Sequence, residues 1–276
     1  MPELPEVEHV KRALQQRIAG RSIVNAELRR RRLAPDTSPR IFDKKIAGAK
    51  IAFVHRRGKH ILIDLDNKRT LIVHLRMSGR FMHLTADDLD PKFTHAVLHF
   101  DDESRLVFED QRHFGLMKVV DTPKLYEAKE LSKLAPEPFS DEFSAEYLAG
   151  VIRSSSRVIK DILLDQTKVC GVGNIYASEA LFLSGINPKK RGKSIGRERC
   201  GHLFQNIRRV LNEAIETGKS IDPHPTVIGE GIYGNGSETR WRVYDREGDE
   251  CISCSSPIKR VVQGSRSTYY CPKCQR

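Results

Sequence analysis

Four of the six cysteines form the clearest chemical pattern in the chain. Cys251 and Cys254 are separated by two residues, and Cys271 and Cys274 repeat that spacing after a gap of 16 residues. Two such pairs, each on a tight turn, can place four thiolates around one zinc ion. Two disulfides are the alternative, but a reducing cytosol disfavours them. The spacing therefore predicts one structural zinc ion with four cysteine ligands and no open coordination position.

The residues between the two cysteine pairs indicate a β-hairpin. Strand-forming residues fill 258–263 and 267–270, and a glycine-containing turn is expected at 264–266. A zinc ribbon of this kind would hold a basic hairpin with Arg266 at its tip.

The start of the chain carries a second possible reaction centre. Removal of Met1 ahead of Pro2 would leave a secondary amine, with Glu3 and Glu6 close by. A free N-terminal amine titrates near a pH of about 8, so part of it is a neutral nucleophile in the cell. Its attack on a sugar C1′ would form a cationic imine, while a carboxylic acid protonates the ring oxygen. Proline and glutamate are also ordinary helix-starting residues, so these residues alone leave both interpretations open.

Composition and charge limit the classes of protein that fit. The chain has 276 residues, 39% hydrophobic and 30% charged, which is typical of a globular protein with a sizeable core. No apolar run approaches the roughly 18 residues of a membrane span, and the acidic N-terminus does not resemble a secretory signal, so we expect a cytoplasmic protein. The net charge of +11 favours a polyanionic partner. The run Arg29–Arg32 could contact phosphate or form a solvated face.

The positions of the hydrophobic residues divide the chain into regions of different structure. A helix is expected from Pro5 until Gly20, followed by closely spaced strands, which is typical of an antiparallel sandwich or barrel. The expected strands are 51–55, 60–65, 70–75, 80–84, 95–100, 105–109 and 115–120. Helices are then expected at 144–152, 157–164, 174–183 and 198–217. Glycine and proline make residues 218–240 an expected mobile loop.

These patterns predict an α+β protein. Residues 1–135 would form an antiparallel β-sandwich with an N-terminal helix, and residues 136–140 a linker. Residues 141–245 would form a helical domain that includes the loop 218–240, and residues 246–276 the zinc finger. The isolated Cys170 and Cys200 are expected to be packed thiols.

Five motifs, in order along nearly the whole chain, resemble the bacterial formamidopyrimidine-DNA glycosylase family. One such motif would mean little, but five in the same order are highly specific. They are MPELPEVE at 1–8, RMSG at 76–79, RHFG at 112–115, GVGNIYASE at 171–179 and GSRSTYYCPKC at 264–274. The resemblance implies a β-sandwich followed by a helix–two-turns–helix element and a zinc hairpin.

The resemblance implies a role for each residue that matches a family motif. Pro2 would be the Schiff-base nucleophile, Glu3 the acid that assists sugar opening, and Glu6 their support. Lys59 would assist β-elimination, and Arg266 phosphate binding and δ-elimination. Met77, Arg112 and Phe114 would fill the gap left by a flipped nucleotide, although the two apolar side chains alone could equally be core residues. The other implied DNA contacts are His74, His95, Lys160, Asn174 and Tyr176.

Two segments depart from the family pattern. Residues 221–240 lack the threonine-rich start and the aromatic-glutamine segment of the usual lesion-capping loop. His113 follows Arg112 at a place where two consecutive arginines are common in the family. The first departure leaves the preference for 8-oxoguanine open.

The expected activity is that of a base-excision-repair DNA glycosylase and abasic-site lyase. Its partner would be double-stranded DNA that contains oxidised purines or abasic sites, and the protein would be a monomer in the bacterial cytoplasm, associated with the nucleoid. An endonuclease VIII-like enzyme for oxidised pyrimidines is one alternative. A non-catalytic protein that binds damaged DNA is another, although the intact Pro2, Glu3 and Lys59 argue against it.

Overall fold

The computed structural model describes residues 1–218, 226–228 and 241–276. It divides the chain into two compact units. The first comprises the described residues of Met1–Ser132 and Thr217–Tyr233, and the second those of Lys133–Glu216 and Gly234–Arg276. Within these ranges, no helix combines the length and the apolar character that a bilayer crossing requires. The domain boundaries expected at 135, 140 and 245 stay predictions.

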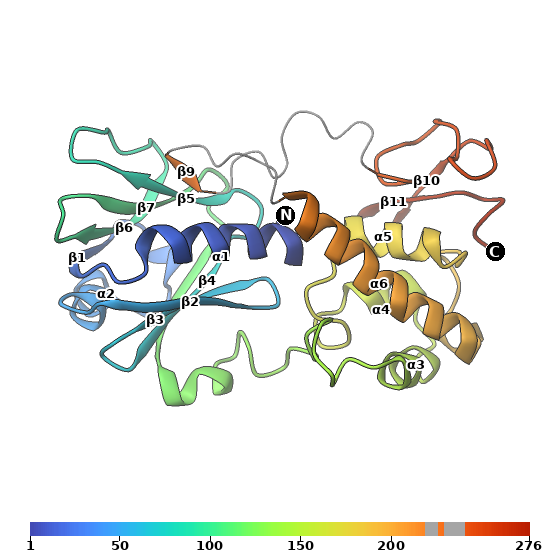
Figure 1. The fold of residues 1–276 in the computed structure, drawn as a ribbon, viewed down its shortest axis with the longest axis horizontal. Coiled ribbons are helices and arrows are strands. Elements are labelled where there is room, and N and C mark those ends of the chain that lie inside the picture. Colours follow the sequence, from blue (N-terminus) through green and yellow to red (C-terminus); the bar gives the residue numbers. More distant parts are fainter. Residues whose placement is uncertain (219–225, 229–240) are drawn as a thin grey trace. The chain divides into compact units, whose positions relative to one another are not determined.

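The first unit contains two antiparallel sheets (Figure 1). One sheet has the strand order β1-β6-β7-β5-β9 and the other the order β2-β3-β4-β8. The strands of the first sheet are β1 (Ile23–Leu28), β5 (Gly79–Leu84), β6 (Thr94–Phe100), β7 (Arg105–Asp110) and β9 (Val227–Ile228). Those of the second are β2 (Ile51–Arg57), β3 (His60–Leu65), β4 (Arg69–His74) and β8 (Leu116–Asp121).

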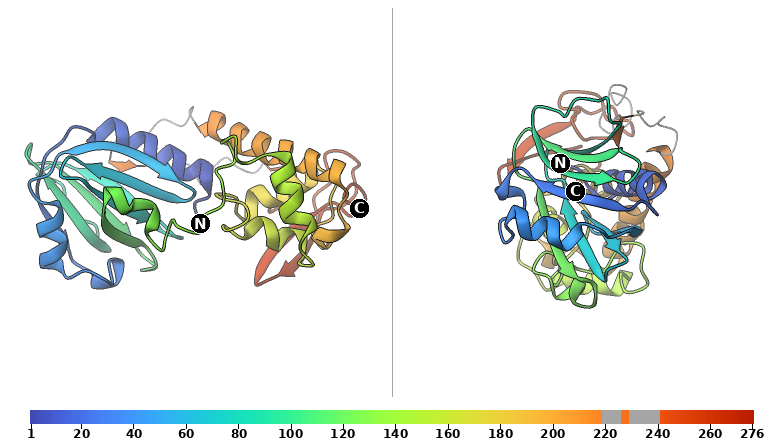
Figure 2. Two further views of the ribbon diagram at one scale, coloured as in Figure 1. Left: turned by 90° about the horizontal axis from the view of Figure 1, so that it is seen from below. Right: turned by 90° about the vertical axis from the view of Figure 1, so that its left-hand side faces the viewer.

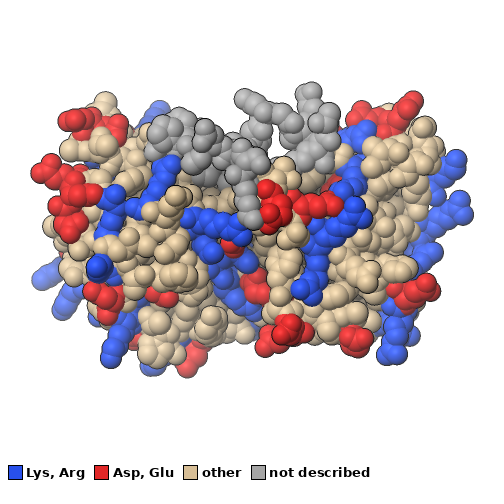
Figure 3. Space-filling model, viewed as in Figure 1, with Lys and Arg blue, Asp and Glu red and all other residues tan. Residues whose placement is uncertain are grey.

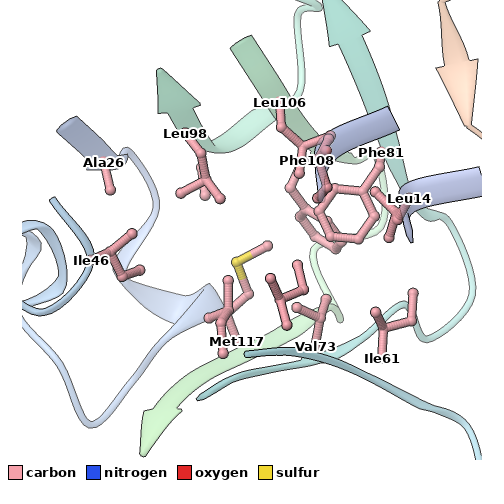
Figure 4. Packing of buried hydrophobic residues seen from close by; sticks show 14 of the residues in the cluster. Leu14, Ala26, Ile46, Ile61, Val73, Phe81, Leu98, Leu106, Phe108 and Met117 are labelled. Atoms are coloured by element: carbon pink, nitrogen blue, oxygen red, sulfur yellow. The ribbon is translucent and has the colours of Figure 1, made fainter. Parts of the chain in front are cut away.

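A single apolar core joins the two sheets and the first helices. Its side chains come from both sheets and from α1 (Leu4–Ile18) and α2 (Pro39–Ile46), as Figure 4 shows. Phe81 and Phe108 meet edge to face, with ring centroids 5.2 Å apart. Helix α1 contacts both β2 and β9, the edge strands of the two sheets, so it covers one side of the sandwich. The packing therefore fixes the start of α1 against the sheets.

The second unit contains the remaining helices and the zinc hairpin (Figure 2). The helices are α3 (Ala145–Arg153), α4 (Ile159–Leu164), α5 (Asn174–Leu183) and α6 (Arg197–Gly218). Helices α4 and α5 pack together across two turns, and α5 also contacts the hairpin of β10 (Lys259–Gln263) and β11 (Arg266–Tyr270). The described residues also form short 3-10 helices, η1 (Arg31–Leu33) and η2 (Thr122–Glu127) in the first unit and η3 (Gly192–Ser194) in the second.

The α+β class is confirmed, and three local expectations are corrected. Helix α2 lies inside the region expected to be β-rich, where Ser38 caps it by accepting a hydrogen bond from the Ile41 N–H. Residues 226–228 lie in the expected loop 218–240, but Val227 and Ile228 pair with β5. The rest of that loop lies outside the described residues, apart from Gly218, which ends α6.

The third correction concerns the zinc hairpin. Gly264 and Ser265 alone form its turn, with φ of 50° and 61°. Positive φ at both central positions is typical of a two-residue type I′ turn. Arg266 therefore begins β11, opposite Gln263.

Candidate active site and DNA-binding surface

The N-terminal residues predicted to do chemistry lie at the beginning of α1. Pro2 is buried, and Glu3 and Glu6 are each only 3% exposed. A capping box opens the helix, in which the Glu6 carboxylate accepts a hydrogen bond of 2.8 Å from the Glu3 backbone N–H. The same contact that caps the beginning of the helix therefore fixes the backbone beside Pro2.

Lys59 lies in the tight hairpin between β2 and β3. Arg57 pairs with His60, so Gly58 and Lys59 form a two-residue turn. Gly58 has a φ of 58°, which a type II′ turn requires at its first central position. The Lys59 side chain is only 4% exposed.

Arg56 ties this hairpin to α1. Its Nε lies 3.0 Å from Glu8 Oε2, and another guanidinium nitrogen donates to the Gly58 carbonyl at 2.9 Å. Glu8 is also bound by Lys11 and Arg12. Burial raises the pKa of Glu8, but these cations outweigh it, so the pKa lies below its ordinary value. Glu8 is thus held as a carboxylate that connects the helix to the turn.

His60 and His74 face each other beside Lys59, on paired positions of β3 and β4. Their rings meet edge to face at 4.7 Å, and His74 Nδ1 accepts a hydrogen bond of 3.0 Å from the Arg76 backbone N–H. Burial lowers the pKa of His60 to about 4, and burial together with nearby positive charge lowers that of His74 to about 2. Both rings are therefore neutral at neutral pH, and the predicted DNA contact His74 lies 7% exposed behind the Arg76 turn.

Asp110 holds together the two loops that carry the predicted gap-filling residues. Its Oδ1 accepts hydrogen bonds from Ser78 Oγ at 2.5 Å and from the Arg112 N–H at 3.2 Å. Its Oδ2 accepts from the Gly115 N–H at 2.7 Å. Burial raises the pKa of this carboxyl, but the hydrogen bonds outweigh it, so the pKa lies below its ordinary value. One buried carboxylate thus fixes both loops.

The same loops also approach one aromatic ring. A Cβ atom on Gly79 would lie 2.7 Å from the Phe108 ring, and one on Gly115 would lie 2.8 Å from it. Glycine is therefore required at both positions, because the Phe108 ring is packed in the core and cannot move away from an added Cβ atom.

The predicted gap-filling side chains are exposed at these loops. Met77 is 48% exposed and Phe114 46% exposed, although both are large and apolar. The guanidinium of Arg112 lies 5.5 Å from the centre of the Phe114 ring, and that of Arg32 lies 5.9 Å from it. The structure therefore excludes the core-packing alternative for these two residues and brings all three predicted side chains to one pair of adjoining loops.

A second set of predicted DNA contacts gathers around β11 in the second unit. Lys160 Nζ donates to Thr268 Oγ1 at 2.7 Å and to the Ser267 carbonyl at 3.2 Å. Asn174 donates to the same carbonyl at 3.0 Å from the first turn of α5. Arg266 is exposed and directly precedes Ser267. The buried Lys160, which is 1% exposed, and Asn174 at the start of α5 therefore both bind β11 directly after the exposed Arg266.

Tyr176, like Lys160, is only 1% exposed. Its ring meets Trp241 edge to face at 5.7 Å.

Gln166, which no sequence pattern indicated, bridges the turn before α5. Its side chain donates to the Leu164 and Val172 carbonyls and accepts from the Gly171 N–H. Such bridging depends on the folded turn and has no spacing signature, as is also true of Asp110.

The four predicted metal ligands lie together. Their Sγ atoms are all within 4.8 Å of one another, with 3.9 Å between Cys251 and Cys274 and 3.5 Å between Cys254 and Cys271. Tetrahedral zinc with Zn–S bonds of about 2.3 Å requires sulfur atoms about 3.8 Å apart. A disulfide requires about 2.05 Å, so the disulfide alternative is wrong. The cluster fits one structural zinc ion.

Basic side chains outnumber acidic ones in the sequence, but they are not segregated on the face that Figure 3 shows. Figure 3 shows lysine and arginine interspersed with acidic side chains over the face in view. Ion pairs use many of the cations, as with Arg29, which contacts Glu27 and Asp90. The local sites described above, rather than the total charge, therefore define where a polyanion would bind.

Known proteins match this chain over almost its entire length. Three family models match in order: the Formamidopyrimidine-DNA glycosylase N-terminal domain at residues 1–117, its H2TH domain at 134–224, and the zinc finger found in FPG and IleRS at 248–276. The Formamidopyrimidine-DNA glycosylase of Dinoroseobacter shibae is 39% identical over 292 residues, with all of both chains covered.

Solved structures give the same result. A Lactococcus lactis Fpg mutant in complex with Fapy-dG containing DNA matches with a TM-score of 0.91 and 32% identity, covering 100% of each chain. The wild-type Lactococcus lactis protein in complex with oxidized pyrimidine containing DNA matches with a TM-score of 0.90 and 31% identity, again over 100% of each chain.

A β-sandwich that begins with a buried proline and two carboxylates, together with an H2TH unit and a four-cysteine zinc ribbon, defines an enzyme of the DNA glycosylase class. The chain belongs to the formamidopyrimidine-DNA glycosylase family.

Proposed function

We propose that this protein removes oxidised purines from double-stranded DNA and then cleaves the strand at the resulting abasic site, with Pro2 as its nucleophile. The observation that carries the proposal is the N-terminal arrangement. A buried proline precedes a helix whose cap is built from two buried carboxylates, Glu3 and Glu6. A single capped helix thereby supplies both an amine and an acid.

The first chemical step replaces two bonds at C1′, to the base and to O4′, with a double bond to the Pro2 nitrogen. Once Met1 has been removed, the neutral Pro2 nitrogen attacks C1′ of the flipped nucleoside, and the damaged base departs with the proton that this nitrogen gives up. Glu3 protonates the ring oxygen as the C1′–O4′ bond opens, which leaves a cationic imine between Pro2 and C1′. Glu6 acts as a positioning residue, because its carboxylate holds the Glu3 backbone.

Strand cleavage follows from the acidity of the imine. The positive nitrogen makes a proton on C2′ removable, and loss of that proton expels the phosphate at C3′. Lys59 is placed at a turn that Gly58 and Arg56 fix, where its ammonium group can contact the phosphate. Arg266 would assist the second elimination, at C5′, from the zinc hairpin.

The two loops that share Asp110 would enter the duplex. Extrusion of a nucleotide leaves an unstacked gap, which exposed apolar side chains can fill. Met77 and Phe114 are the exposed apolar residues of these loops, and Arg112 carries the donors that could pair with the orphaned base. In the second unit, Lys160, Asn174 and Arg266 would hold a backbone phosphate.

Borohydride trapping on DNA with an abasic site tests the nucleophile. Reduction of the imine should yield a covalent protein–DNA adduct, and Pro2→Gly should reduce its yield at least tenfold. Pro5→Ala is the matched control, because it changes a proline of the same helix start without touching the amine. Absence of an adduct from the wild-type chain, or equal yields from the Pro2→Gly variant, would refute the proposal.

A second candidate substrate is an oxidised pyrimidine. The solved Lactococcus lactis relative in complex with oxidized pyrimidine containing DNA favours it. Cleavage of matched duplexes that contain formamidopyrimidine, 8-oxoguanine or thymine glycol separates the two. A strong preference for thymine glycol would overturn the purine assignment.

The remaining proposals concern the protein as a whole. We propose that it acts as a monomer, at the bacterial nucleoid in the cytoplasm, and that no membrane takes part. The absence of a membrane-spanning helix from the described residues supports the last point only. Sedimentation of the protein alone and on a short duplex tests the first: a complex with two protein copies per lesion would contradict it.

A further inference from the structure

His113 and His95 form a pair of hydrogen-bonded imidazole rings next to the loops that would enter the DNA. His95 Nε2 lies 2.9 Å from His113 Nδ1, and the ring planes are inclined by only 18°. His95 is 3% exposed in β6, whereas His113 is partly exposed between Arg112 and Phe114. His113 also has a φ of 60°, a conformation in which histidine is enriched.

The surroundings of His95 determine which ring donates. A backbone hydrogen bond with Asp110 raises the pKa of His95, so it comes from the carbonyl oxygen, which can only accept. Because Nε2 faces His113, the donor to that carbonyl is His95 Nδ1. A neutral His95 then has Nε2 as an acceptor, and His113 Nδ1 must donate to it. Protonation of His113 therefore adds its proton at Nε2 and leaves the pair intact.

Positive groups surround the pair. Burial lowers the pKa of His95, although Asp110 opposes this effect, and the charges of His113 and Arg30 lower it further. Asp110 at the end of β7 and Arg30 before η1 act on His95. The other nearby cations lie against neighbouring rings: Arg32 and Arg112 against Phe114, and Lys92 against Phe93, which contacts His113. Cations therefore predominate around the pair, and a DNA phosphate would bring a negative charge to it.

We infer that His113 is a further DNA-binding residue, which takes up one proton at Nε2 when a backbone phosphate approaches it, and that His95 orients its ring. The Nδ1–H bond to His95 directs the opposite edge of the ring, which carries Nε2, away from β6. A protonated Nε2 is a donor, and the imidazolium would form a charge-assisted hydrogen bond to a phosphate oxygen. The inference rests on the proposed function, because it requires DNA at these loops.

A measurement of affinity as a function of pH and salt tests this inference. The probe is a duplex with a non-cleavable abasic-site analogue, bound by the full chain between pH 5.5 and 8.5. If one proton enters with the DNA, affinity falls as pH rises, by up to about tenfold per pH unit. The slope of log K against log salt should also be steeper at pH 5.5 than at pH 8.5, by about 0.9 for one extra phosphate contact.

Three variants separate this contact from a structural effect. His113→Asn keeps a residue that tolerates positive φ but removes the titrating ring, so it should bind more weakly at pH 5.5 and lose the difference in salt slope. His113→Arg should restore tight binding with a salt slope that no longer depends on pH. His99→Gln is the matched control. It removes an imidazole from β6, the strand of His95, but the His99 ring contacts Glu27 and not His113.

Two outcomes would overturn the inference. One is a wild-type salt slope that is equal at both pH values, and the other is a pH dependence that survives in His113→Asn. Neither outcome affects the proposed function, which the borohydride adduct tests by itself. If instead no adduct forms and the duplex does not bind, the proposed function fails first.

Discussion

At the scale of single residues, buried carboxylates place side chains that do the proposed chemistry. Glu6 fixes the backbone of Glu3, Glu8 fixes Arg56 and through it the carbonyl of Gly58, and Asp110 fixes two loops. Each of these acids has hydrogen-bond donors around it. The protein therefore contains acidic groups at the centre of a site that attracts a polyanion.

Asp110→Asn tests this arrangement at its most connected point. The amide would present donors to at least one of the backbone N–H groups that now donate to Asp110, so we expect the free energy of unfolding to fall by about 1–3 kcal/mol. Denaturant unfolding measures this loss, and single-turnover base excision should slow as well. Ser78→Ala removes one donor and should have the smaller effect on both. If Ser78→Ala proves as harmful as Asp110→Asn, the carboxylate is not the hub of the two loops.

At the scale of secondary-structure elements, short turns place the functional groups and the sheets hold them. The turn at Gly58 and Lys59 joins two strands whose register is continuous from Val54 to Arg57. Because a two-residue hairpin has few allowed conformations, Lys59 cannot shift without disturbing β2 and β3. Precision at this lysine thus comes from the sheet.

Gly58→Ala should separate the positioning of Lys59 from the stability of the fold. Alanine at a φ of 58° is strained, and we expect a loss of about 1 kcal/mol together with a several-fold lower yield of borohydride adduct. Gly48→Ala is the control, because Gly48 has a φ of 75° and no atom within 4 Å of an added Cβ. It should show a similar stability loss but an unchanged adduct yield. Equal adduct yields from both variants would contradict the role of the turn.

The paired strands β3 and β4 carry a pH prediction. His60 and His74 have pKa values of about 4 and about 2 in the folded chain, well below the ordinary value near 6.5. The unfolded chain therefore binds protons first as the pH falls. The contribution of these histidines to the free energy of unfolding should be fully present above pH 6.5. Below pH 6.5 it should fall, and the slope should approach about 1.4 kcal/mol per pH unit for each histidine. Urea unfolding of His60→Gln/His74→Gln should show a flatter dependence between pH 6.5 and 4.5, and an unchanged slope would exclude the pair as its source.

At the scale of the whole molecule, the two units obtain their stability from different sources. The first has one apolar core between two sheets. In the second, a small cluster that includes Val243, Ile258 and Tyr269 packs around the cysteines. Because that cluster is small, the zinc ion must supply much of the stability of the hairpin that carries Arg266.

Removal of zinc should therefore affect the units unequally. A strong chelator should abolish DNA binding and loosen residues 241–276, while amides in the strands of the first unit keep their protection. Hydrogen exchange resolved along the chain measures both effects, and added zinc should reverse them. Uniform loss of protection in both units would show that zinc stabilises the whole chain instead.

The sequence predicted the parts of this protein that depend on local patterns. Cysteine spacing predicted the zinc cluster, and alternating hydrophobic residues predicted most strands within one or two residues. It did not predict Asp110 or Gln166, whose partners come together only when distant turns fold. It also missed α2, although Ser38 and Pro39 are typical of a helix start, because the surrounding β-rich pattern outweighed eight residues. The roles of Pro2, Lys59 and Arg266 stay predictions.

The shared attachment of the two loops constrains how relatives of this protein can diverge. Ser78 and Gly79 on one loop and Gly115 on the other contact the same Asp110 carboxylate or the same Phe108 ring. A change at one of these positions must be matched by a change at another, so they should covary or stay fixed. The His113 side chain is hydrogen-bonded to His95 instead, outside that shared attachment. A residue that tolerates positive φ could replace His113 without disturbing Asp110 or Phe108, so a lineage could change its DNA contact here while both loops keep their attachment.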